Sequence, residues 1–277
     1  MKRLFLDTNV YNHIADVEAE CIKQSIEARQ FEVLTTPQIL AELAATFKKD
    51  KALAVRLCNI YADLISDHVL QPPPVLIQTE ISSVLKGDRS TVLYLQGENK
   101  MEFFSYVEKL KSGNIDLYVE QFIDRIGRLK KEQFRYSKLR FSKIEPHVLE
   151  EPLKKYPTFH QFLMEGIRRG ERLKELERYV VKDFGKNTHQ AAKFIEKRLG
   201  KTPHLGIALR VVPALSYYYH VEKNKPKHGD IFDCGYFVCL ATVDGFVSDD
   251  EGARYLFRLI CPHKQCLSLA AFINLLA

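Results

Sequence analysis

Two apolar runs that end in aspartate lie near the two ends of this chain of 277 residues. The first is Leu4–Leu6 followed by Asp7, and the second is Phe246–Ser248 followed by Asp249 and Asp250. Buried strands of parallel sheets are continuous apolar runs, and their carboxyl ends meet at one edge of the sheet. We therefore predict one acidic site that is built from both ends of the chain, with a long segment inserted between them.

The first part of the chain alternates between strand and helix patterns. Strands are expected at 3–6 and 31–35, and helices at 16–30, at about 37–48 and at roughly 51–66. This order is typical of an α/β fold in which helices cover a parallel sheet.

The middle of the chain has a different pattern. The three prolines within 71–74 remove backbone donors and predict a linker or the entry to a new unit. From about 75 to 220, apolar residues recur at helical spacing, and a polar segment at 223–229 closes this part. Beyond it we expect a helix at 231–243, a strand at 245–248, a further strand or helix end at 256–260 and a final helix at 268–276. The predicted units are a discontinuous domain, 1–69 plus 229–277, and a mainly helical insertion, 70–228.

The net charge of +6 is unevenly divided between these two units. Residues 70–228 carry 30 Lys or Arg against 19 Asp or Glu, whereas the rest of the chain carries 11 against 16. A basic surface favours polyanions such as nucleic acid, and an acidic cluster favours cations. Many of these charges also fit solvated helix faces, but the division indicates two separate roles.

The acidic residues of the discontinuous domain form a candidate metal site. Asp7 and Asp250 follow strand-like runs, Glu42 lies in the helix after the second strand, and Asp230 and Asp233 lie three apart at a helix start. Carboxylates gathered in this way repel one another unless a cation lies among them or some are protonated. Oxygen ligands without His or Cys favour Mg²⁺ or Mn²⁺, which activate water and stabilise displacement at phosphorus.

These residues resemble the motifs of the PIN-domain nucleases, a family that includes the ribonuclease toxins of bacterial toxin–antitoxin pairs. The resemblance rests on four segments in order: Leu4–Asn9, Ile39–Leu43, the Asp230/Asp233 pair and Phe246–Asp250. It covers about 1–69 and 229–277. It implies a compact three-layer α/β/α fold with a central parallel sheet, which the helical insertion interrupts here.

The resemblance also implies roles for individual residues. Asp7, Glu42, Asp233 and Asp250 would be the catalytic metal ligands, and Asp230 a fifth acid bound directly or through water. Asp230 and Asp249 remain alternatives to their neighbours. Thr8, Asn9 and Ser248 would donate supporting hydrogen bonds, and a metal-bound water would be the nucleophile.

The insertion carries a basic run that we assign to substrate binding. Arg and Lys neutralise phosphates, and interleaved aromatic residues can stack on unpaired bases, although most of those here also fit a helix core. With Asn9, the candidate substrate-binding residues are Arg128, Lys130, Lys131 and Arg135.

The leading functional hypothesis is therefore a Mg²⁺- or Mn²⁺-dependent endoribonuclease that hydrolyses RNA. The alternatives are a nuclease for DNA or structured nucleic acid, and a nucleic-acid-binding protein without activity. RNA is the expected partner. The resemblance also leaves room for a protein inhibitor or antitoxin and for a homodimer.

Compartment and cysteine chemistry follow from simpler features. No apolar run approaches 18 residues, and Asp7 interrupts the short apolar start, so we expect a cytoplasmic protein without a membrane span. The six cysteines are scattered, which favours reduced thiols. We interpret Cys261 and Cys266 as ordinary thiols, because a zinc site usually pairs two such clusters.

Overall fold

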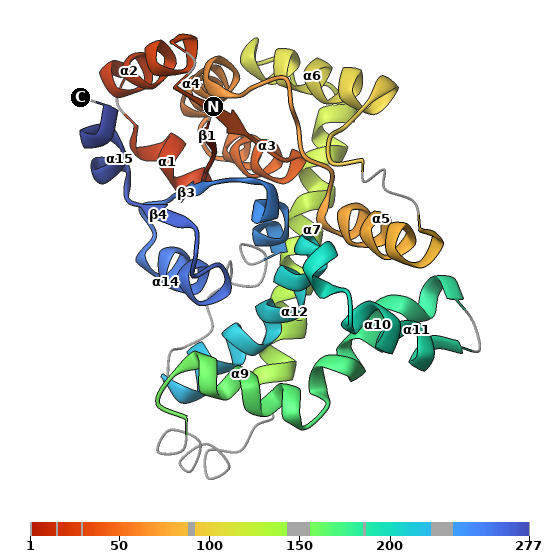
Figure 1. The fold of residues 1–277 in the computed structure, drawn as a ribbon. Coiled ribbons are helices and arrows are strands. Elements are labelled where there is room, and N and C mark those ends of the chain that lie inside the picture. Colours follow the sequence, from red (N-terminus) through yellow and green to blue (C-terminus); the bar gives the residue numbers. More distant parts are fainter. Residues whose placement is uncertain are drawn as a thin grey trace.

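The computed structural model describes residues 2–14, 16–28, 30–87, 92–142, 156–184, 187–222 and 235–276. Its centre is a four-stranded parallel sheet in the order β2-β1-β3-β4 (Figure 1). The strands are β1 (Lys2–Leu6), β2 (Phe31–Leu34), β3 (Gly245–Val247) and β4 (Gln265–Leu267). The two central strands thus come from opposite ends of the chain. This confirms an α/β fold with a parallel sheet.

Both faces of this sheet are covered. On one face, Phe5 of β1 stacks on Tyr236 with ring centroids 5.4 Å apart, and its register partner Phe246 lies 4.8 Å from the ring of Phe257. On the other face, Phe31 of β2 contacts the ring of Phe272. Burial on both faces explains why the central strands are continuously apolar rather than alternating.

Around the sheet lie the helices expected at 16–30, at about 37–48, at roughly 51–66 and at 268–276, together with a helix at 8–13 that was not predicted. The helices there are α1 (Thr8–His13), α2 (Asp16–Glu27), α3 (Pro37–Ala44), η1 (Ala45–Lys48), α4 (Lys51–Leu64), η5 (Val238–Thr242), α14 (Glu251–Ile260) and α15 (Leu269–Leu276). Thr36 and Pro37 occupy the N-cap and first position of α3, where the missing proline N–H costs no hydrogen bond.

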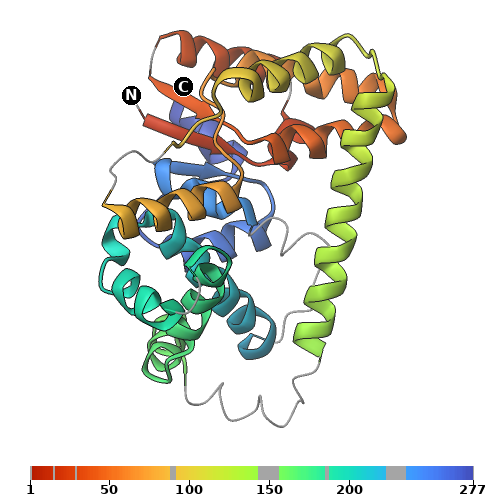
Figure 2. The same ribbon diagram turned by 90° about the vertical axis from the view of Figure 1, so that its right-hand side faces the viewer.

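Residues 70–228 are helical in most of what the structure describes of them. The elements are α5 (Pro73–Lys86), α6 (Gly97–Lys111), α7 (Leu117–Ser142), α9 (Phe159–Arg168), α10 (Glu171–Phe184), α11 (Thr188–Glu196), η3 (Leu199–Lys201), α12 (Pro203–Ser216) and η4 (Tyr217–Val221). Figure 2 shows α7 as a long column along one side of the molecule. The proline run begins α5 directly, with Pro73 at its first position.

These helices pack directly against the elements around the sheet. Helix α6 packs on α4, α7 on α3, and α12 on both η5 and α14. Their buried apolar side chains join those of the sheet in one hydrophobic core. The division into a discontinuous domain and an insertion stays a prediction, because this core runs through both.

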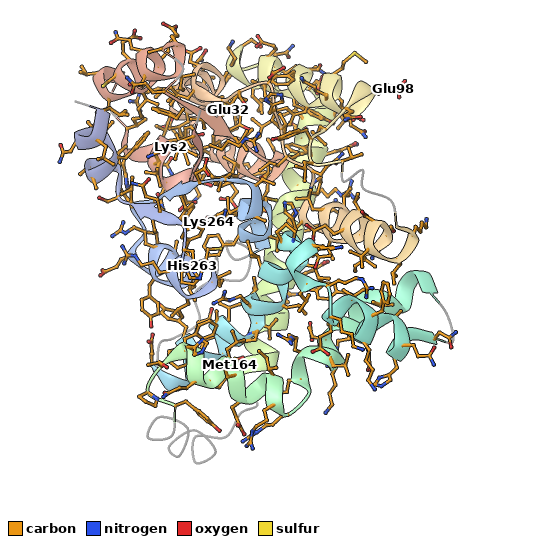
Figure 3. The ribbon with its side chains drawn as sticks, viewed as in Figure 1. Lys2, Glu32, Glu98, Met164, His263 and Lys264 are labelled. Atoms are coloured by element: carbon orange, nitrogen blue, oxygen red, sulfur yellow. The ribbon has the colours of Figure 1, made fainter. Side chains whose placement is uncertain are left out.

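The end of the chain differs in detail from the sequence-based expectation. Residues 256–260 are the second half of helix α14, whose buried residues include Leu256, Phe257 and Ile260, so of the two alternatives expected there the helix end is confirmed. The fourth strand, β4, was not predicted; it overlaps the end of the Cys261–Cys266 segment that was considered for zinc. Lys264, just before it, donates hydrogen bonds to the carbonyls of Ala241 and Val243 at η5 (Figure 3). Of the helix expected at 231–243, residues 231–234 lie outside the described residues.

The cysteines that the structure describes are free thiols. Burial raises the pKa of Cys261 to about 12, which keeps this thiol protonated at neutral pH. Among the described helices, none combines the length and the apolar character needed to cross a membrane.

Candidate functional site

Asp7 lies where β1 ends and α1 begins. Its backbone N–H donates to the carbonyl of Val247 at 2.9 Å, which extends the pairing of β1 and β3 by one residue. Its side chain caps α1 by accepting a 2.7 Å hydrogen bond from the N–H of Thr8. The residue is 6% exposed. The local sequence therefore places this acid at the edge of the core, at the carboxyl ends of the two central strands.

Each of the two carboxylate oxygens of Asp7 accepts two hydrogen bonds. Oδ1 accepts from Thr8 N–H and, at 2.9 Å, from the hydroxyl of Tyr236. Oδ2 accepts from the Asn9 amide at 2.7 Å and from the Ser248 hydroxyl at 2.6 Å. An ionised carboxylate offers about four lone-pair sites. The four hydrogen bonds therefore fill all the acceptor sites of Asp7. Asn9 and Ser248 thus hold the Asp7 carboxylate in place by hydrogen bonds.

The protonation of Asp7 reflects its burial. Desolvation raises the pKa of this carboxyl from 3.8 to about 6, and the charge of Glu42 contributes to the rise. The hydrogen bonds from Ser248, Tyr236 and Thr8 favour the charged form and limit the rise. The effect of burial on the pKa exceeds that of the hydrogen bonds, because the site excludes water on most sides.

Glu42 approaches this group from helix α3. The Thr8 hydroxyl donates a 2.6 Å hydrogen bond to its Oε2, while the Thr8 backbone N–H donates to Asp7. Thr8 therefore connects the two carboxylates. The predicted convergence of Asp7 and Glu42 is present in the structure, and their electrostatic coupling agrees with it.

The acids after β3 are held differently. Asp250 is exposed, and its Oδ1 caps α14 by accepting from Ala253 N–H at 2.9 Å. Asp249 accepts from Leu269 N–H at 2.9 Å at the start of α15, and it lies 3.3 Å from the His13 ring nitrogen Nδ1. Its backbone N–H donates to the Asn9 side chain. Both acids have structural partners, so which of the two would bind a metal stays a prediction.

The structure gives few contacts for the other two candidate regions, the Asp230/Asp233 pair and the basic run of α7. Asp230 and Asp233 lie outside the described residues. Arg128, Lys131 and Arg135 are exposed on α7, the helix that packs on α3, whereas the side chain of Lys130 lies outside the described part of the chain. Among the residues that the structure describes, no group of three or more His, Cys, Asp or Glu is arranged to hold a metal ion.

Three residues at this edge were not predicted from the sequence. Tyr236 bonds to Asp7, His13 lies beside Asp249, and Arg254 donates a 2.6 Å hydrogen bond to the carbonyl of Ser248. Tyr236 lies in an apolar segment and His13 in a short polar helix, where no motif marks them. Only their position close to the acidic motifs along the chain could have drawn attention to them.

Comparisons with family models, with curated proteins and with solved structures find no match for this chain.

Proposed function

We propose that this protein is a Mg²⁺- or Mn²⁺-dependent endoribonuclease with a PIN-like three-layer nuclease domain. The observation that carries the proposal is the hydrogen-bond group at Asp7. It joins Asp7, Asn9 and Ser248 from the two ends of the chain, and Thr8 links it to Glu42. The sheet, covered on both faces, supports the PIN-like architecture.

The donor chemistry of this group fits a hard divalent cation. Asp7 and Glu42 offer carboxylate oxygens. Burial and the charge of Glu42 both disfavour the ionised form of Asp7, and a nearby cation would favour it. The proposed ligand set is Asp7, Glu42, Asp250 and the Asp230/Asp233 pair. A cation bound there supplies Lewis-acid activation of water and of the phosphodiester. The chain's own contribution is to orient Asp7 through Ser248 and Asn9.

The test is cleavage of labelled single-stranded RNA and DNA with Mn²⁺ or with EDTA. The variant is Asp7→Asn, and the matched control is Asp244→Asn. Asp244 is an exposed acid at the opposite, amino end of β3, where it accepts from the N–H of Arg3 at 2.7 Å. We expect Mn²⁺-dependent RNA cleavage that Asp7→Asn abolishes and Asp244→Asn retains. Metal-dependent cleavage that survives Asp7→Asn would contradict the proposed site.

A second candidate function is nucleic-acid binding without cleavage. The observation that favours it is the occupancy of all acceptor sites on Asp7, which gives that carboxylate a structural role without any metal. RNA binding with no cleavage in Mg²⁺ or Mn²⁺ would support this function over the first.

A further inference from the structure

A pocket of about 890 Å³ lies between α9, α10, α12 and the end of α14, in the lower part of Figure 1. Its apolar wall includes Phe162, Leu163 and Ile167 of α9, together with Leu209 of α12 and Leu259 of α14. Its volume lies within the range of small-molecule sites, roughly 300–1,000 Å³. Helix α14 begins at the acidic edge of the sheet and ends at this pocket, so the two sites are separate.

One face of α12 forms the back of the pocket. Gly206, Leu209, Arg210 and Pro213 recur at helical spacing, and all four line the pocket. Pro213 has no N–H to donate, so the carbonyl of Leu209 lacks its usual helical donor. The chain then continues as a π-helical turn, a form that is frequent at functional sites. The helix is thus irregular where it borders the pocket.

Arg210 is a partly buried charged group of this wall. Its Nη2 donates to the carbonyl of Leu259 at 3.1 Å, and its guanidinium carbon lies 6.0 Å from the centroid of the Phe159 ring. Its Nε is buried and has no hydrogen-bond partner among the described residues. A buried donor left in this state costs free energy, which a small shift of Arg210 toward an acceptor bound in the pocket would recover.

The lining as a whole has an excess of positive charge. Five Lys or Arg side chains line the pocket against two Glu, Glu171 and Glu175. Arg178 is paired with Glu175, and Arg172 is paired with Glu196 at 3.1 Å. The other cations of the lining, Lys174, Arg210 and Arg258, form no ion pair with a carboxylate of the described chain. His263, which follows α14 in the chain and is labelled in Figure 3, also lines the pocket.

We propose that this pocket binds an amphipathic carboxylate, with its apolar chain against α9 and α12 and its carboxylate on Arg210. The apolar wall of α9 and α12 favours a hydrocarbon body against it. A guanidinium matches one carboxylate through two parallel N–H donors, and the remaining surface cations attract the anion to the mouth. This proposal does not depend on nuclease activity.

The experiment is a displacement titration with 11-(dansylamino)undecanoic acid as the fluorescent probe. Laurate and dodecanol, which share a chain length, are the competitors. We expect laurate to displace the probe at a concentration at least about tenfold lower than dodecanol, because only laurate meets the charge of Arg210. Equal potency of the two would overturn the assignment of the head group.

Two variants test the location. Arg210→Met should weaken laurate by about tenfold and leave dodecanol nearly unchanged. Gly206→Leu should abolish probe binding, because a Cβ at Gly206 meets no atom of the described residues within 4 Å and the new side chain fills the pocket. The substitution replaces a mid-helix glycine with a better helix former, so the fold should be retained; thermal unfolding checks this.

Gly127→Leu is the matched control, since Gly127 is also a glycine within a helix, α7; a Cβ there meets no atom within 4 Å in the described part of the chain, and Gly127 has no part in the pocket. It should bind the probe like the unaltered chain. If the folded Gly206→Leu variant also binds the probe with unchanged affinity, the pocket is not the binding site and the proposal fails.

Discussion

At the scale of single residues, Asp7 combines strong hydrogen bonding with an unfavourable environment. It receives four hydrogen bonds, yet its pKa is raised to about 6 because burial penalises the carboxylate. Residues with strongly shifted pKa values are concentrated at functional sites, where the arrangement that serves the reaction lowers the stability of the fold. The behaviour of this one carboxyl therefore tests whether the acidic edge is a site or part of the scaffold.

The pH dependence of stability gives the first prediction. Between about pH 4 and 6 the folded chain holds a proton on Asp7 that the unfolded chain has released. This stabilising contribution is complete below about pH 4 and is lost as pH rises through about 6, a change of about 3 kcal/mol. In Asp7→Asn this part of the slope should vanish. Urea unfolding at a series of pH values across this window measures it.

The Asp244→Asn variant is again the control, because Asp244 is exposed and lies at the other edge of the sheet. Its profile should follow that of the unaltered chain. Parallel profiles for Asp7→Asn and the unaltered chain would mean that Asp7 does not titrate in this window.

Tyr236 gives a second prediction at the residue scale. Its hydroxyl occupies a lone pair of Asp7 Oδ1 that a metal ion would need. In Tyr236→Phe this lone pair is released, so Mn²⁺ should raise the unfolding temperature of the variant more than that of the unaltered chain under mildly alkaline conditions. The same increase in both proteins would show that the hydroxyl does not compete with the metal.

At the scale of elements, the start of α12 depends on one buried acid of α5. Glu80 accepts from the N–H groups of His204 and Leu205 at 3.0 and 2.9 Å, and it lies 2.6 Å from the His204 ring nitrogen Nδ1. Both side chains are almost fully buried. Glu80 therefore satisfies the free donors of the first helical turn and joins α5 to α12.

Glu80→Ala should lower the free energy of unfolding by about 3 kcal/mol, because it leaves two helix donors and a ring nitrogen buried without an acceptor. Glu98→Ala is the matched control, since Glu98 is an exposed acid in the first turn of α6 (labelled in Figure 3). Its loss should change the stability by less than about 0.5 kcal/mol. Equal effects of the two substitutions, measured by chemical denaturation, would show that the buried hydrogen bonds of Glu80 add nothing.

The elements also show what a sequence can predict. Strands β1, β2 and β3 were expected because each is a mainly apolar run that ends at a polar residue. Asp7 was expected at the carboxyl edge because it follows such a strand, and Glu42 was expected near it from the helix after the second strand. Strand β4 was missed because it has only three residues, begins at the exposed polar Gln265 and follows closely on a proline. The bond from Tyr236 to Asp7 spans 229 residues and depends on tertiary packing, which no local pattern encodes.

At the scale of the whole molecule, the positive charge of residues 70–228 includes exposed side chains on α7, and α7 packs on the helix that carries Glu42. If Arg128, Lys131 and Arg135 bind an RNA backbone, the triple charge reversal to Glu should weaken single-stranded RNA binding. It should also make the salt dependence of the logarithm of affinity shallower by about 0.7 for each phosphate that the variant no longer neutralises. Affinity measured across a series of salt concentrations gives both quantities.

The matched control reverses three exposed lysines elsewhere in the same unit: Lys193 of α11, Lys197 just after it and Lys201 of η3. It changes the net charge by the same amount, so it separates local binding from the field of the whole protein. A local site predicts a shallower slope only for the α7 variant. Equal losses of affinity in both variants would assign the attraction to net charge, and unchanged affinity in both would remove RNA binding from this surface.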